Sequence, residues 1–111
     1  MKRTGNMLKR SAMRRPEGTY TAIILDFGVE DYAGGERLVI EMKLTDETGW
    51  EETVRDRINE NRLPYFEGAL LRQIDRDFNE IEQMLEYCTE HSFTVCYSYD
   101  KTYGDQYDYR G

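Results

Sequence analysis

The chain has 111 residues, which is enough for one domain and argues against a second independent core. Charged residues make up 33% and hydrophobic residues 39%, and no uncharged run approaches the ~20 apolar residues that a membrane-spanning helix needs. Met7-Leu8 is followed at once by Lys9-Arg10, so the apolar stretch of a secretion signal is missing near the amino end. We therefore expect a soluble, cytoplasmic protein that makes no membrane contact.

Charge is divided unevenly along the chain. Residues 1–15 contain six bases and no acid, whereas the rest of the chain carries 22 acids and 9 bases, a net charge of −13. We expect residues 1–15 to form a basic, disordered arm and residues 16–111 to form the folded domain. An acidic body repels phosphate at long range, so contact with nucleic acid has to rely on the arm or on a locally basic groove.

Three strand patterns follow the arm. Residues 19–27 form a β-branched and aromatic run, and residues 28–35 contain several turn formers. In residues 38–45 apolar side chains alternate with mostly polar ones, which predicts a strand with one buried face in an antiparallel sheet. After a turn at 45–49, a weaker alternation over 50–58 predicts a third strand. We expect the first two strands to form a hairpin-like pair.

The period then changes to that of a helix. Apolar residues recur every three or four positions from Phe66 to Cys88, which predicts a helical segment from Pro64 to Tyr87. This stripe fits one long helix, or two short helices broken around 75–79 with Asn79 capping the second. Alternation over 93–99 predicts a fourth strand, and residues 106–110 predict a short fifth strand.

The order of three strands, a helical segment and two strands predicts an all-β fold with a helical insert. This is the element order of a small five-stranded Greek-key barrel, the oligonucleotide-binding (OB) fold. Such barrels bind single-stranded nucleic acid by stacking bases on aromatic rings while basic groups follow the phosphates.

The sequence contains both kinds of group. Nine tyrosines are present, and five of them lie in residues 97–109. Strand period places Tyr97 and Tyr99 on the same face as Phe93, so we expect those two in the core and the later tyrosines at the surface. The candidate nucleic-acid contacts are Arg14, Arg15, Arg37, Lys43, Trp50, Arg55, Arg57, Lys101, Tyr103, Tyr107 and Tyr109, with Arg110 as a further phosphate contact.

No pattern in the sequence indicates catalysis or a cofactor. We find no phosphate loop, dinucleotide glycine fingerprint or nucleophile elbow, and His91 is the only histidine. Cys88, His91 and Cys96 would give zinc three ligands where it takes four, so an acidic oxygen would have to complete the site. We expect two reduced thiols, no metal and no enzymatic activity.

The pattern of strands and turns formed by residues 16–22, 35–40, 91–95, 99–101 and 106–107 resembles a family of small phage and mobile-element proteins. Members of this family are largely uncharacterised or described as single-stranded-DNA-binding-like. The similarity extends over residues 16–109. It implies an OB-like barrel that acts in replication or recombination of a mobile genome.

Two functions from different classes follow. The leading interpretation is a non-enzymatic protein of a phage or mobile element that binds single-stranded nucleic acid. The alternative is an acidic, anti-CRISPR-like inhibitor whose surface imitates nucleic-acid charge and binds a basic host nuclease. A structural piece of a larger assembly is a third interpretation, and an exposed strand edge near the carboxyl end leaves a homodimer open.

Overall fold

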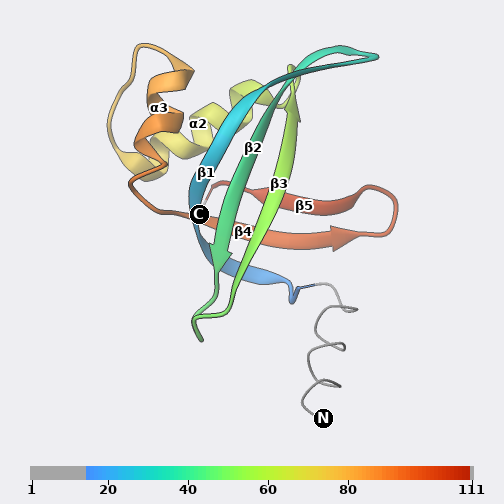
Figure 1. The fold of residues 1–111 in the computed structure, drawn as a ribbon, viewed down its shortest axis with the longest axis vertical. Helices are drawn as coiled ribbons and strands as arrows, with labels where there is room; N and C mark the ends of the chain where they lie inside the picture. Colours follow the sequence, from blue (N-terminus) through green and yellow to red (C-terminus); the bar gives the residue numbers. More distant parts are fainter. Residues whose placement is uncertain (1–14, 111) are drawn as a thin grey trace.

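A computed structural model describes residues 15–110. The elements in chain order are β1 (Gly18–Tyr32), β2 (Gly35–Thr45), β3 (Glu51–Asn59), α2 (Leu63–Ile74), α3 (Ile81–Tyr87), β4 (Phe93–Asp100) and β5 (Gly104–Asp108). The predicted order of three strands, a helical segment and two strands is confirmed. Figure 1 shows β1, β2 and β3 running side by side while β4 and β5 cross them.

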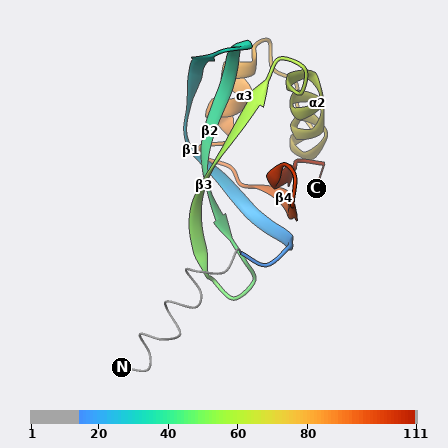
Figure 2. The ribbon, with the colours of Figure 1, turned by 90° about the vertical axis from the view of Figure 1, so that its right-hand side faces the viewer.

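All five strands form one antiparallel sheet in the order β3-β2-β1-β4-β5. β1 pairs with β4 through Gly18 to Ala22 and with β2 from Thr21 onward, so that Thr21 lies opposite both Thr45 of β2 and Thr94 of β4. A bulge between Ile24 and Asp26 then shifts the register, and bulges bend and twist a strand. The sheet is open, with β3 and β5 at its edges, and Figure 2 shows both helices on the same side of β1–β3 as β4.

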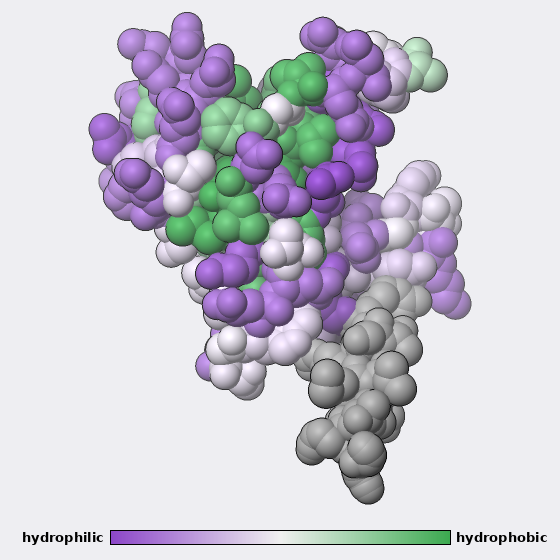
Figure 3. All heavy atoms as spheres, in the orientation of Figure 1, coloured by the Kyte–Doolittle hydropathy of each residue, from purple (hydrophilic) through white to green (hydrophobic). Residues whose placement is uncertain are grey.

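The core lies between the inner face of the sheet and the two helices. In β2 the residues Leu38, Ile40, Met42 and Leu44 are buried while the residues between them are half-buried, which confirms the predicted alternation. Both helices add apolar side chains, chiefly Phe66, Leu70, Met84 and Leu85. Figure 3 shows hydrophobic residues reaching the surface between the helices and the strands, with hydrophilic residues around them. Each fully buried side chain of this size stabilises the fold by roughly 1.5–3 kcal/mol relative to leaving it exposed.

The predicted turn over residues 28–35 is wrong in its bounds. β1 continues to Tyr32, which pairs with Gly35, so the connection to β2 is only Ala33-Gly34. Pairing with β2 outweighs the turn preference of the glycine and aspartate residues in 28–31, because every residue of this stretch has a partner on β2. Gly35 has a φ of 123°, a conformation that residues with a side chain rarely adopt.

The helical segment consists of two helices, one of the two alternatives that the sequence left open. α2 ends where Asp75 adopts a left-handed conformation (φ 58°) and donates its N–H to the carbonyl of Leu71 at 3.0 Å. α3 begins with a reciprocal capping box between Glu80 and Gln83, so the prediction of Asn79 as the cap is wrong by one residue. No helix within residues 15–110 is long and apolar enough to cross a membrane.

Gln73 joins α2 to the ends of β4 and β5. Its amide nitrogen donates to the carbonyl oxygens of Thr94 (2.7 Å) and Tyr109 (2.5 Å), and its amide oxygen accepts the N–H of Thr94 at 2.8 Å. The β4–β5 ladder ends at the pair Cys96 and Asp108. The side-chain amide therefore satisfies backbone groups just beyond the ladder.

Replacing Gln73 by glutamate is expected to lower the free energy of unfolding by about 1–3 kcal/mol. The carboxylate keeps an acceptor for the N–H of Thr94, but it cannot donate to either carbonyl oxygen. Urea denaturation measures the change, provided that the slope with denaturant stays constant. Gln106→Glu, at an exposed position of β5, is the control; equal destabilisation by both substitutions would contradict the role given to Gln73.

Candidate nucleic-acid interface

Four of the predicted basic contacts lie on the outer face of β2 and β3, and each one is paired with a carboxylate. The pairs are Arg37 with Glu30 (2.6 Å), Arg57 with Glu30 (3.1 Å), Arg55 with Glu41 (3.3 Å) and Lys43 with Glu51 (3.5 Å). The hydrogen bond from Arg37 is the main reason that the pKa of Glu30 is lowered. Exposed pairs of this kind add little stability, but they cancel the positive potential that would attract phosphate. The structure thus brings these bases together on a face that carries almost as many acids.

Other predicted contacts do not lie on the outer face of β2 and β3. Lys101 and Tyr103 are in the turn between β4 and β5, and the side chain of Tyr103 is 79% exposed. In the sheet order this turn lies on the other side of β1 from β2 and β3. Trp50 is half-buried against the core just before β3, and Arg14 lies outside the described residues.

Tyr107 and Tyr109 are buried, so the prediction that both rings lie at the surface is wrong. Their exposed fractions are 8% and 3%. Tyr107 packs on Tyr97 (ring centroids 5.6 Å apart) and Tyr109 meets Phe66 edge-on at 4.8 Å. Tyr97 is 2% exposed, as predicted, whereas Tyr99 is 36% exposed because the β4–β5 hairpin projects beyond the other strands there (Figure 1).

Arg15 belongs to the folded domain, although it was predicted to be part of the arm. Its side chain is 9% exposed, and its guanidinium forms a two-pronged contact with Glu52 at 3.0 and 2.8 Å. It also donates to the hydroxyl of Tyr107 at 3.1 Å and lies 4.7 Å from the centre of the Tyr97 ring. Burial alone would lower the pKa of Arg15, but Glu52, Tyr107 and Asp105 together raise it. Because Glu52 is in β3 and Tyr107 in β5, Arg15 links the two edges of the open sheet.

Asp56 provides a second link between β3 and the end of the chain. It is 8% exposed, and it is the one buried charged residue among those the structure describes. It accepts the hydroxyl proton of Tyr109 at 2.7 Å and two contacts from the guanidinium of Arg62 at 3.4 Å. Burial and the negative charge of Asp56 raise the pKa of Tyr109 well above its ordinary value, so this hydroxyl remains a donor at physiological pH.

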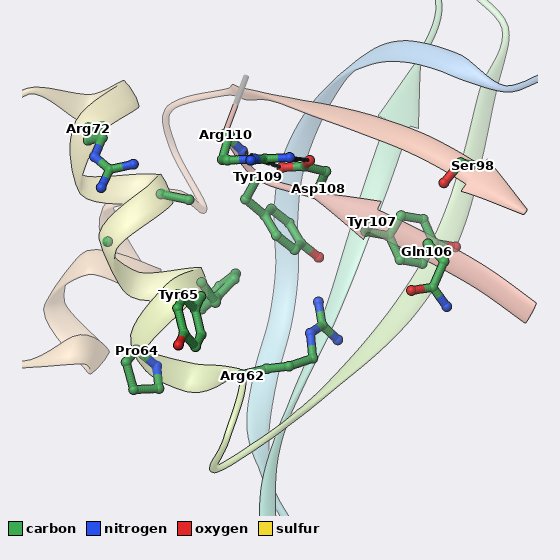
Figure 4. A pocket seen from close by; sticks show the side chains of 13 residues that line it. Arg62, Pro64, Tyr65, Arg72, Ser98, Gln106, Tyr107, Asp108, Tyr109 and Arg110 are labelled. Carbon is green, nitrogen blue, oxygen red and sulfur yellow. Dashed lines mark hydrogen bonds and ion pairs between the residues drawn. The ribbon is translucent and has the colours of Figure 1, made fainter. Parts of the chain in front are cut away.

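A hollow of about 580 Å³ lies between α2 and the β4–β5 hairpin. Figure 4 shows Arg62, Tyr65 and Arg72 on the α2 side and Ser98, Gln106 and Arg110 on the strand side. The ring of Tyr65 is 80% exposed. We call this hollow the α2–β5 groove; its lining consists of Arg62, Pro64, Tyr65, Phe66, Gly68, Ala69, Arg72, Ser98, Gln106, Tyr107, Asp108, Tyr109 and Arg110.

The groove is locally basic in an acidic domain. Residues 15–110 hold 22 acids and 10 bases, yet three arginines and one carboxylate line the groove. Arg110 is held by Asp108 at 2.6 Å, which lowers the pKa of Asp108. Arg62 is paired with Asp56. Arg72, in the last turn of α2, has no ion-pair partner within residues 15–110.

Arg110 was among the predicted contacts, whereas Arg62, Tyr65 and Arg72 were missed. The helical segment was predicted from its apolar stripe, which begins at Phe66 and faces the core. The missed residues lie on the neighbouring stripe, where Tyr65 and Arg72 are two helical turns apart with Gly68 and Ala69 between them. A pair of small residues between an aromatic residue and a basic one on the same side of a helix indicates a hollow. This pattern in the sequence could have pointed to the groove.

The cysteines and the histidine do not form a site together. Both thiols are free, and burial raises the pKa of Cys88 to about 11. His91 stacks on the ring of Tyr87 with centroids 3.9 Å apart. Within residues 15–110, no group of three or more histidine, cysteine or acidic side chains is placed to hold a metal ion.

No model of a known protein family matches the chain, and no curated protein matches it. The resemblance to small phage proteins therefore stays a prediction. A function for this protein has to be inferred from the groove and from the charges around it.

Proposed function

We propose that this protein is a non-enzymatic, single-stranded nucleic-acid-binding protein of a phage or mobile element, and that the α2–β5 groove holds the strand. The observation that carries this proposal is the concentration of Arg62, Arg72 and Arg110 with the exposed ring of Tyr65 around one hollow. Guanidinium groups bind phosphate, and an exposed ring gives a base a surface for stacking.

The strand arrangement supports the OB-fold part of the proposal. An antiparallel sheet in the order β3-β2-β1-β4-β5, with helices between β3 and β4, is the arrangement of an OB barrel before its edges close. In this interpretation side chains join β3 to β5 and to the residue that follows it: Arg15 connects Glu52 to Tyr107, and the carboxylate of Asp56 accepts a hydrogen bond from the hydroxyl of Tyr109.

The groove offers different contacts to different parts of a nucleotide. Arg72 and Arg110 are exposed and lie at the rim, where a phosphate can reach them from solvent. Ser98 and Gln106 are exposed polar residues on the strand side and supply hydrogen bonds to sugar or base edges. The acidic residues elsewhere on the domain repel phosphate, so they confine a bound strand to this groove.

Gly68 allows binding to be tested separately from folding. A Cβ atom added there meets no atom within 4 Å, and the residue lines the groove. Gly68→Leu is expected to keep or raise stability, because glycine costs a helix interior about 1 kcal/mol. The leucine side chain would occupy the groove and weaken binding of a labelled oligo-dT about tenfold, the loss expected when one stacked base is displaced. Fluorescence anisotropy measures the binding and urea denaturation the stability.

Gly68→Ala is the matched control, since it gives the same gain in helix propensity with far less obstruction. We expect its affinity to stay within about twofold of the unsubstituted protein. A duplex of the same length should bind more weakly than the single strand, because paired bases cannot reach Tyr65. The proposal fails if oligo-dT does not bind at low salt, or if Gly68→Leu binds it as tightly as Gly68→Ala.

One observation favours the alternative, an acidic protein that binds a basic host nuclease. Six carboxylates lie in residues 75–90, around α3, and within residues 15–110 none of them forms an ion pair. Replacing Glu82 and Glu86 by lysine distinguishes the two functions. Single-strand binding would be unchanged or tighter after the replacement, whereas binding to a basic nuclease through this face would be abolished.

A further inference from the structure

We propose that a small apolar groove near the turn between β1 and β2 docks a protein segment in which a bulky apolar residue is accompanied by lysine or arginine. The groove has a volume of about 170 Å³ and is lined by residues of β1, β2 and β3 and of both helices. We call it the hairpin groove. The residues that line it differ from those that line the α2–β5 groove, so the inference goes beyond the proposed function and does not depend on it.

The hairpin groove lies where the inner face of the sheet extends past the core. Leu38 of β2 and Ile58 of β3 are 9% and 1% exposed, so they form its floor. Val29 of β1 is opposite Leu38 and on the same face, yet its side chain is 67% exposed. Leu63 and Ile81, at the starts of the two helices, are half-buried and complete the apolar lining. Figure 1 shows this part of the hairpin at the same end of the molecule as both helices.

The size of the hairpin groove suits one bulky side chain. A volume of about 170 Å³ is close to the roughly 150 Å³ of an engineered apolar cavity that binds benzene. Covering the exposed methyl groups of Val29 would remove apolar surface from water, which favours association. We therefore expect a leucine, isoleucine, methionine or phenylalanine of the partner to enter the groove.

A row of carboxylates borders the groove on the side of the hairpin turn. Asp31 and Glu36 are opposite each other in the β1–β2 ladder, two residues beyond Val29 and Leu38, and so lie on the same inner face. Glu60 follows β3 and lines the groove together with Glu36. All three acids are exposed, and among the described residues none of them forms an ion pair. Like charges opposite each other destabilise a sheet, and a basic partner would relieve this repulsion.

The one base in the lining does not neutralise this row. The guanidinium of Arg37 lies 2.6 Å from the carboxylate of Glu30 and 4.5 Å from the centre of the Tyr32 ring. Charge complementarity therefore favours a basic partner. It disfavours nucleic acid, and it disfavours a second copy of this domain, because residues 15–110 hold 22 acids and 10 bases.

The spacing of the two rows defines the segment further. Residues two positions apart in a strand are separated by about 6.6–6.8 Å, so the carboxylates lie about this far from the apolar row. An extended segment matches this separation with an apolar residue and a base two positions apart. A helix matches it with the two residues four positions apart, which is about 6 Å along its axis.

The test begins with a displayed library of random 12-residue peptides, selected on the full-length protein in about 150 mM salt, where distant charges are screened. The best peptide is then synthesised with a fluorescent label, and anisotropy measures its affinity. Val29→Gln removes the exposed apolar side chain of the groove. Leu25→Gln is the matched control, because Leu25 is also in β1 and is 48% exposed but is not among the lining residues.

A second pair of variants tests the carboxylates. The groove-neutral variant carries Asp31→Asn, Glu36→Gln and Glu60→Gln. The α3-neutral control carries Asp77→Asn, Glu82→Gln and Glu86→Gln, which removes the same number of exposed charges in and beside α3. Circular dichroism checks that each variant is folded, and the groove-neutral variant should resist urea at least as well as the unsubstituted protein because the repulsion is gone.

We expect the selected peptides to combine a bulky apolar residue with lysine or arginine at one of the two spacings. The labelled peptide should bind Val29→Gln about fivefold more weakly and Leu25→Gln within about twofold of the unsubstituted protein. It should bind the groove-neutral variant about tenfold more weakly and the α3-neutral control within about twofold.

Four results would overturn the inference. The first is that no peptide is selected, and the second is that Val29→Gln and Leu25→Gln bind the peptide equally well. The third is an equal loss in both neutral variants, since the peptide would then respond only to the overall charge. The fourth is another occupant: self-association in sedimentation, or binding of oligo-dT, that Val29→Gln abolishes. Failure to bind oligo-dT at all would contradict the proposed function and leave these peptide measurements unaffected.

Discussion

Replacing Arg72 and Arg110 together by alanine is expected to weaken binding of oligo-dT at least about tenfold in about 50 mM salt. Both side chains are exposed at the rim of the α2–β5 groove. For a single strand, the slope of log affinity against log salt should become shallower by about 0.7 for every phosphate that the protein no longer neutralises. Anisotropy over a salt series measures both effects. Arg62 is left in place because its ion pair with the buried Asp56 supports the fold.

The control replaces Arg55 and Arg57 by alanine, which removes two arginines from the outer face of β3. These arginines are paired with Glu41 and Glu30, so we expect the affinity to change less than about twofold. If this control weakens binding as much as the groove variant does, the strand lies on the outer face of β2 and β3 instead.

A substitution that is expected to tighten binding of oligo-dT complements this pair of variants. Asp108 contacts the guanidinium of Arg110 at 2.6 Å and is the one carboxylate in the lining of the groove. Asp108→Asn removes a negative charge and frees Arg110 for phosphate, so binding should become several-fold tighter. Weaker binding would show that Asp108 holds Arg110 in the position that phosphate requires.

Much of the fold could be predicted because its signals are local. The alternation in 38–45 identified β2 and its buried face, and the period of three to four identified the helical segment. The bounds of β1 were not predictable in this way, because the residues after Phe27 prefer turns locally and are held in a strand by pairing with β2. The break at Asp75 likewise depends on a left-handed residue that ends α2.

The site was harder to predict because its residues depend on distant partners. Asp56 lies at an inward position of β3, where an acid interrupts the apolar alternation expected of a strand. Its hydrogen-bond partner Tyr109 is 53 residues away in the sequence. Arg15 looks like part of a basic tail in the sequence, and only the folded chain brings Glu52 and Tyr107 beside it. Spacing along the chain carries no information about such pairs, and the bases of β2 and β3 could be found without revealing that carboxylates neutralise them.

Tyr109→Phe is expected to lower the free energy of unfolding by about 2 kcal/mol. The phenylalanine ring keeps the edge-on contact with Phe66 (4.8 Å), so the packing changes little. What disappears is the hydrogen bond of 2.7 Å to Asp56. A carboxylate that is 8% exposed then retains Arg62 alone, at 3.4 Å. A buried charge left with fewer partners costs more than an exposed one.

Tyr103→Phe is the matched control for this substitution, because the side chain of Tyr103 is 79% exposed and water can satisfy its hydroxyl. Its effect on the free energy of unfolding should stay below about 0.5 kcal/mol. Urea denaturation of the two variants at one pH gives the comparison directly. If both variants are destabilised by the same small amount, Asp56 must be solvated in the folded protein, and the link between β3 and the end of the chain would then depend on Arg15 and its ion pair with Glu52.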